Sequence, residues 1–127
     1  MPDLGDFLVA ASHRKHRYGE WDCCTFPADW CIANGWPDPM AEWRGGYIDA
    51  SAADDGLLPL FAAGMFGSGI GATKEPVAGD VGVVSVLGQE AGAIFTGKRW
   101  ALVAPRGLAF ASLEPSCVLM AWSVTRG

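Results

Sequence analysis

Apolar side chains follow a helical spacing at the start of the chain. They stand three or four residues apart, at Leu4, Phe7, Leu8 and Ala11. Asp3 precedes this series, and an aspartate in that position accepts hydrogen bonds from the free amides of a first helical turn. The pattern predicts an amphipathic helix over about residues 3–16.

A second helix is predicted after a glycine turn at residues 18–21. Asp22 is a suitable capping residue for a helix that runs through Ile32, and Asn34-Gly35 is a typical stop. Pro27 allows two alternatives for the first turn of this helix. Either the helix begins nearer Thr25, so that the proline lies in a first turn where no amide donor is missed, or its first turn is distorted.

Acidic and hydroxyl side chains then indicate further helix starts. Ser51, Asp54 and Asp55 suit the positive end of a helix dipole. They predict short helices that continue through Leu60 and Met65. The glycine-rich stretch at residues 67–71 is expected to end the helical half of the chain.

From residue 79 the pattern changes to short runs rich in Val, Ile, Phe and Trp, which are typical of strands. The runs cover residues 81–87, 91–96, 100–104, 108–111 and 117–124. Their separators are short and contain Gly or Pro, so neighbouring strands are expected to pair antiparallel. The pattern predicts the α+β class: one domain over residues 1–127, with helices over about 1–66 packed on an antiparallel sheet of about five strands over about 79–125.

Composition agrees with one packed domain and excludes several classes of function. Half of the 127 residues are hydrophobic and 18% are charged, so the chain can bury a core. The net charge of −5, with nine Lys and Arg, argues against a nucleic-acid partner, because phosphate binding needs a basic surface. The longest apolar run, residues 57–66, is about half the length that crosses a bilayer, so we expect no membrane span.

The cysteines and the first residues bear on location and on metals. No basic start is followed by an apolar run, so we expect no secretory signal and predict synthesis in the cytoplasm. The four cysteines are then expected to be reduced thiols. They form no Cys-x-x-Cys pair, and His13 and His16 lack a partner pair, so the sequence predicts no metal site and no cofactor.

The segment at residues 18–26 is the best candidate for chemistry. It places Cys23 directly after a glycine turn and an aspartate, at the start of a predicted helix. The partial positive charge of a helix N-terminus stabilises a thiolate, which is the nucleophilic form of cysteine. The alternative is that Cys23 and Cys24 are small residues that pack the helix against the sheet, since free cysteines are often buried.

Three segments resemble the motifs of the NlpC-type papain-like peptidases of bacterial cell walls and phage tails. The first motif, a Gly turn followed by Asp-Cys and a hydrophobic residue, is matched by Gly19, Asp22, Cys23 and Phe26. Gly79-Asp80-Val81 is similar to the motif that opens the first core strand of that family. Residues 90–95 are similar to its His-Val-Gly-Ile strand, but Glu90 stands where the catalytic histidine is expected. The resemblance implies a papain-like fold with Cys23 at the position of the nucleophile.

A closer resemblance is to small proteins encoded among the tail-tip genes of phages and gene-transfer agents. Those proteins share a Gly-x-x-Asp-Cys-Cys segment, an Arg-Gly-x-Tyr stretch like residues 44–47, and a final Ala-Trp strand like Ala121-Trp122. The resemblance implies a virion component of a tail tip or baseplate. Its partners would be other tail-tip proteins and peptidoglycan, and it would be made in the bacterial cytoplasm and assembled into a phage-like particle.

The missing histidine decides between the functional hypotheses. A cysteine peptidase needs a general base within reach of the sulfur, and both histidines precede Cys23 on the first predicted helix. A carboxylate at Glu90 would instead raise the pKa of a neighbouring thiol. We therefore favour a structural or assembly protein without catalysis. The alternatives are an active peptidase or amidase that cuts peptidoglycan with Cys23 as nucleophile, and a glycan-binding module.

The glycan-binding alternative depends on the tryptophans alone. Six are present, and exposed aromatic side chains often carry the binding energy of an interface. Trp30 and Trp122 lie inside predicted elements and are expected in the core. Trp36 and Trp43 lie in a loop rich in Pro and Gly and are the candidates for an interface.

Overall fold

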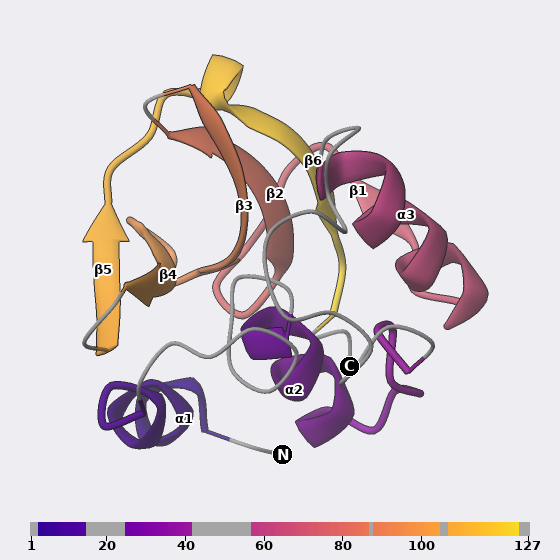
Figure 1. Cartoon of the computed structure of the whole chain (residues 1–127), viewed down its shortest axis with the longest axis horizontal. Helices are drawn as coiled ribbons and strands as arrows, with labels where there is room; N and C mark the ends of the chain where they lie inside the picture. Colours follow the sequence, from indigo (N-terminus) through magenta and orange to yellow (C-terminus); the bar gives the residue numbers. More distant parts are fainter. Residues whose placement is uncertain (1–2, 15–24, 42–56, 87, 105–106, 125–127) are drawn as a thin grey trace.

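A computed structural model describes residues 3–14, 25–41, 57–86, 88–104 and 107–124 of the chain. Three helices come first and most of the strands follow (Figure 1). The helices are α1 (Leu4–Ala11), α2 (Thr25–Ala33) and α3 (Leu57–Gly67). The strands are β1 (Ala72–Thr73), β2 (Val81–Val86), β3 (Gln89–Phe95), β4 (Trp100–Ala104), β5 (Gly107–Ala111) and β6 (Val118–Trp122), with the 3-10 helix η2 (Pro115–Cys117) before β6.

Helix α1 begins where the sequence predicts and ends earlier. The Asp3 side chain accepts a hydrogen bond from the Asp6 amide at 2.9 Å, which confirms the predicted cap. The helix stops at Ala11 rather than near residue 16, because the following amides of Ser12 and His13 bond to Leu8 and Ala10 as a closing turn. The predicted apolar face of α1 is confirmed, since its side chains pack on the larger core cluster.

Helices α2 and α3 each hold a proline in the first turn, where no hydrogen bond is lost. In α2 this is Pro27, as the predicted start near Thr25 requires, and Gly35 ends the region with a φ of 90°. In α3 it is Pro59, and this helix contains Leu60 and Met65, through which the sequence predicts short helices. Asp22, Asp54 and Asp55 lie outside the described residues.

The sheet has six strands in the order β1-β6-β2-β3-β4-β5, and every neighbouring pair is antiparallel. The predicted meander is confirmed for β2 to β5. The prediction that the last strand would form a hairpin with β5 is wrong, because β6 pairs with β2 instead. The segment between β5 and β6 crosses one face of the sheet, where Leu113 and Val118 cover Trp100. Strand β1 was not predicted from the sequence.

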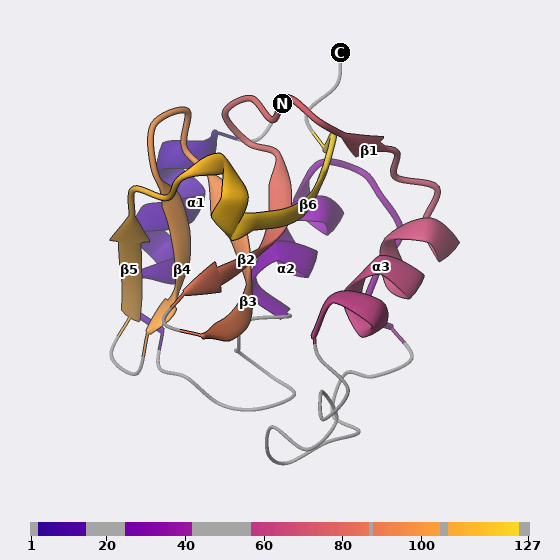
Figure 2. The same cartoon turned by 90° about the horizontal axis from the view of Figure 1, so that it is seen from above.

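The sheet separates two apolar clusters. Figure 2 shows α1 and α2 on one face of the sheet and the segment that leads into β6 on the other. The larger cluster lies under the three helices and contains Phe26, Trp30, Phe61, Met65 and Trp122, all of them buried. The smaller cluster lies on the other face, beneath the crossing segment, and centres on Trp100. None of the helices in the described part of the chain is long and apolar enough to span a membrane.

Candidate functional site

The candidate nucleophile Cys23 lies outside the described residues, together with Asp22, Cys24 and His16. His13 is exposed in the turn after α1. The other two motifs of the resemblance are described in full. Gly79-Asp80-Val81 leads into β2, and Glu90 lies near the start of β3, so the two segments belong to neighbouring strands.

Asp80 is the most buried charged residue of the described chain, with 2% of its surface exposed. Its Oδ2 accepts from the Val77 amide at 2.9 Å and its Oδ1 accepts from the Val124 amide at 3.1 Å. Both carboxylate oxygens are therefore occupied by main-chain donors. The side chain joins the loop before β2 to the residues after β6, which are 44 positions apart in the sequence.

The main chain around Asp80 extends this junction to β3 and α2. The Phe95 amide donates to the Asp80 carbonyl at 2.8 Å, and the Gly79 amide donates to the Phe95 carbonyl at 2.7 Å. The indole Nε1 of Trp30 donates to the Gly79 carbonyl at 2.7 Å. We refer to Gly79, Asp80 and these partners as the Asp80 corner. The Gly-Asp motif therefore holds four segments together and leaves no free carboxylate oxygen for chemistry.

Glu90 connects the sheet to helix α3. Its Oε1 accepts a hydrogen bond from the amide of Leu58, the second residue of α3, at 2.8 Å. The first amides of a helix have no partner within the helix, and an anion beside them is favoured by the helix dipole. The carboxylate that replaces the expected histidine is thus a cap supplied by a strand to a helix more than thirty positions away in the sequence.

Two cysteines lie in the described part of the chain, Cys31 and Cys117. Cys31 lies on α2 and is fully buried. Burial raises the pKa of this thiol to about 12, and the negative charge of Asp38 adds to the increase. A thiol of this kind is protonated at neutral pH and is a poor nucleophile. Cys117 is half-buried at the end of η2.

The four described tryptophans divide between the two clusters. Trp30 and Trp122 are buried in the larger core, as predicted. Trp36 is half-buried, packs on that core and donates its indole Nε1 to the Val124 carbonyl at 2.9 Å. It therefore has structural partners within this chain, and its role at an interface stays a prediction. Trp43 lies outside the described residues.

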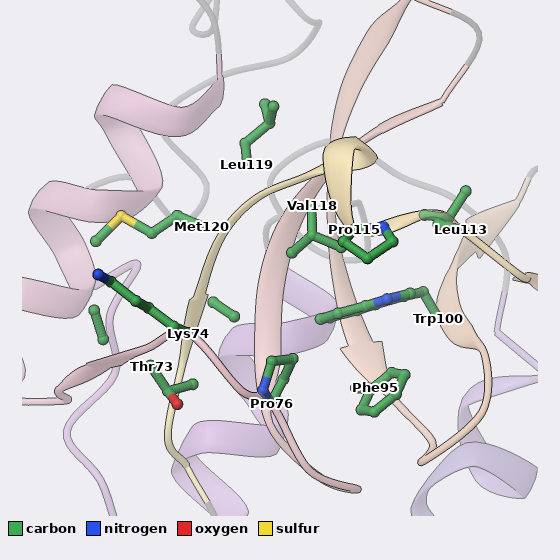
Figure 3. A pocket seen from close by; sticks show the side chains of 12 residues that line it. Thr73, Lys74, Pro76, Phe95, Trp100, Leu113, Pro115, Val118, Leu119 and Met120 are labelled. Carbon is green, nitrogen blue, oxygen red and sulfur yellow. The ribbon is translucent and has the colours of Figure 1, made fainter.

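A groove of about 690 Å³ opens on the face of the sheet opposite the helices (Figure 3). Its walls come from the chain around β1, from η2 and from β6, and Phe95 and Trp100 lie side by side in it with ring centroids 4.9 Å apart. The indole of Trp100 lies against Gly82, where an added Cβ would come within 2.9 Å of it. Trp100 is only 3% exposed, so it fills the sheet face and offers little surface for stacking on a sugar ring.

No pattern in the sequence indicates this groove directly, because it depends on the crossing of the segment before β6. Among the described residues, its lining contains one charged side chain, Lys74. Within the described residues no three His, Cys, Asp or Glu side chains gather as a metal site would require. The groove lining contains no carboxylate, thiol or imidazole among the described residues, and the single carboxylate of the Asp80 corner accepts from two main-chain amides.

The fold and the two motif strands define a small α+β protein in which the motif carboxylates have structural partners. Its family is given by sequence comparison. The chain belongs to the DUF6950 family, a domain of unknown function, whose model matches residues 1–124. No curated protein and no solved structure showed significant similarity to the chain.

Proposed function

We propose that this protein is a structural or assembly component of a phage-like tail tip, and that it has a papain-like scaffold without cysteine-peptidase activity. The observation that carries the second half of the proposal is the hydrogen bond from the Leu58 amide to Glu90. The first half is supported by the sequence resemblance to tail-tip proteins. Other tail-tip and baseplate proteins are the proposed partners, and assembly into the particle follows synthesis in the bacterial cytoplasm.

The argument against catalysis starts from what the histidine does in a cysteine peptidase. A neutral imidazole takes the proton of the thiol, and the resulting cation then stabilises the thiolate beside it. A carboxylate has the opposite electrostatic effect, because a negative neighbour raises the pKa of a thiol. Glu90 also has a structural partner in α3, which accounts for a carboxylate at this position without any catalytic role.

Digestion of purified peptidoglycan tests the absence of catalysis. We expect no release of fragments, measured by mass spectrometry, from the wild-type protein or from Cys23→Ala. We also expect none from Glu90→Gln, which keeps an oxygen for the Leu58 amide. Cutting by the wild type that disappears in Cys23→Ala would contradict the proposal and support the peptidase alternative.

Particle assembly tests the structural role. In a bacterium that produces the phage-like particle, deletion of the gene is expected to stop the formation of complete tails, as seen by electron microscopy. Complementation with Cys23→Ala is expected to restore them, because the thiol has no catalytic role in this proposal. Normal tails in the deletion strain, or particles that lack the protein by mass spectrometry, would rule out the assembly role.

A further inference from the structure

The two edges of the sheet are built differently. At one edge, β1 has only two residues, and the charged pair Lys74 and Glu75 follows it. The neighbouring strand β6 has an irregularity that leaves Leu119 without a partner in β2. Short strands, charges and bulges are the usual means by which proteins prevent the pairing of sheet edges between molecules.

The opposite edge, β5, has none of these features. All five of its residues pair with β4 in an unbroken register, and its sequence Gly-Leu-Ala-Phe-Ala contains no charge and no proline. No element of the described chain lies beyond it in the sheet order. Phe110 is 42% exposed on this strand, although the guanidinium of Arg99 lies 5.3 Å from its ring centre.

Along β4 and β5, the main-chain N–H and C=O groups of successive residues point alternately to the two neighbouring sides. This alternation shows which groups have no strand partner in the described chain at the β5 edge. The Thr96 amide donates to the Arg99 carbonyl, so Arg99, and then Ala101, direct their main-chain groups toward β3. Leu102 must then face β5, where it pairs with Ala109. The neighbours of Ala109 on β5, Leu108 and Phe110, therefore direct their N–H and C=O groups away from the sheet.

Strand β5 is complementary to itself. We propose that two copies of this protein associate through antiparallel pairing of their β5 strands about a twofold axis at Ala109. Leu108 of each copy would lie opposite Phe110 of the other, where the outward N–H and C=O groups form hydrogen bonds. The two Ala109 residues would form the close pair at the axis, where small side chains fit.

The apolar side chains support this arrangement. Leu108 pairs with Val103 on the helix side of the sheet, and Phe110 is two residues along the same face. Cross-strand contacts between Leu108 and Phe110 would cover apolar surface that is exposed in the single chain. Gly107 fixes the start of β5, because its backbone lies against the Ser12 carbonyl, which an added Cβ would approach within 2.6 Å. The edge strand is therefore held ready for pairing.

This inference goes beyond the proposed function, because it holds whether or not the protein cuts peptidoglycan. Sedimentation velocity of the whole chain, over a wide range of protein concentration, provides the test. The wild type is expected to shift from the monomer mass toward twice that mass as concentration rises. Ala109→Ser, which keeps a small neutral side chain, is the control and is expected to behave in the same way.

Charged variants at the axis make the test specific to β5. Ala109→Lys and Ala109→Glu each place like charges opposite one another, and each is expected to weaken association by about tenfold. Mixing the two variants is expected to restore association, because opposite charges then meet at the axis. Circular dichroism of each variant shows that the fold is kept, which is expected because Ala109 is exposed.

Three outcomes would overturn the inference. A wild type that stays monomeric at all concentrations would show that a second copy does not occupy this edge and leave a strand of another protein as the candidate. Undiminished association of Ala109→Lys would place the contact elsewhere on the molecule. Failure of the mixed variants to associate, in a protein whose wild type does, would exclude pairing centred on Ala109.

Discussion

Asp80 and Glu90 are carboxylates beside neighbouring strands, and both accept hydrogen bonds from main-chain amides, but they differ in burial. Asp80 is 2% exposed and uses both oxygens, whereas Glu90 is exposed and one oxygen accepts from Leu58. The motif residue that agrees with the peptidase resemblance thus holds the interior together. The one that departs from it stabilises a helix end at the surface, where a change of residue type disturbs little packing.

Replacement of Asp80 is the strongest test of this difference. Asp80→Ala leaves the amides of Val77 and Val124 without their acceptors in a buried site. We expect the free energy of unfolding to fall by about 3 kcal/mol, since each unsatisfied donor costs roughly 1–3 kcal/mol. Urea denaturation followed by tryptophan fluorescence measures the change.

Asp80→Asn is the matched control, because it keeps one carbonyl oxygen as an acceptor at nearly the same volume. It is expected to lose less stability than Asp80→Ala. A loss below about 1 kcal/mol in Asp80→Ala would mean that water replaces the carboxylate, and the corner would then not be a structural junction.

Replacement of Glu90 is expected to have a much smaller effect. Glu90→Ala removes a cap from α3, and the loss of a cap at an exposed helix end costs about 0.5–1 kcal/mol. Glu90→Gln keeps the acceptor for the Leu58 amide and loses only the charge, so its unfolding free energy should lie between those of the wild type and Glu90→Ala. The same urea titration measures both variants. Equal losses in Glu90→Ala and Asp80→Ala would remove the distinction between the two sites.

The elements of the fold that follow from local sequence patterns could be predicted, and those that depend on distant segments could not. Periodicity located the three helical regions and five of the six strands, because apolar spacing and Gly or Pro turns are local signals. The pairing of β6 with β2 was missed, since it joins strands that three other strands separate in the sequence. Strand β1 was missed because two residues carry no periodicity.

The candidate site was predictable only as residue positions. The motif pattern placed Asp80 at the start of one predicted strand and Glu90 just before another, but the sequence does not show which groups donate to each carboxylate. Glu90 was interpreted as a poor substitute for a base, and its partner on α3 is visible only in three dimensions. The loop composition around Trp36 does not reveal its hydrogen bond to the Val124 carbonyl either.

Alkylation of the Cys31 thiol also distinguishes the Asp80 corner from Glu90, and almost no reaction is expected in the folded wild type. Its pKa is raised to about 12, first by burial and then by Asp38, so the thiol is protonated at pH 8 and out of reach of reagents. We expect almost no alkylation of Cys31 by iodoacetamide in the folded wild type, as measured by peptide mass spectrometry. Unfolding in urea should make it react as an ordinary thiol.

Asp80→Ala and Glu90→Ala should differ in the rate at which Cys31 is alkylated. Trp30, the neighbour of Cys31 on α2, is bound to the Gly79 carbonyl at the Asp80 corner, so weakening the corner should free the helix. Alkylation of Cys31 is expected to be faster in Asp80→Ala than in the wild type, and almost unchanged in Glu90→Ala. Similar rates in all three proteins would show that the corner does not hold α2.

The raised pKa of Cys31 also has a consequence for stability at alkaline pH. The unfolded thiol ionises near its ordinary value of 9.0, and the folded thiol near 12, so the folded state binds more protons between these values. The stability that this thiol contributes is therefore complete below pH 9 and is lost as the pH rises toward 12. Cys31→Ala should show a weaker decline over that interval in urea titrations, and an equal decline would mean that other groups cause it.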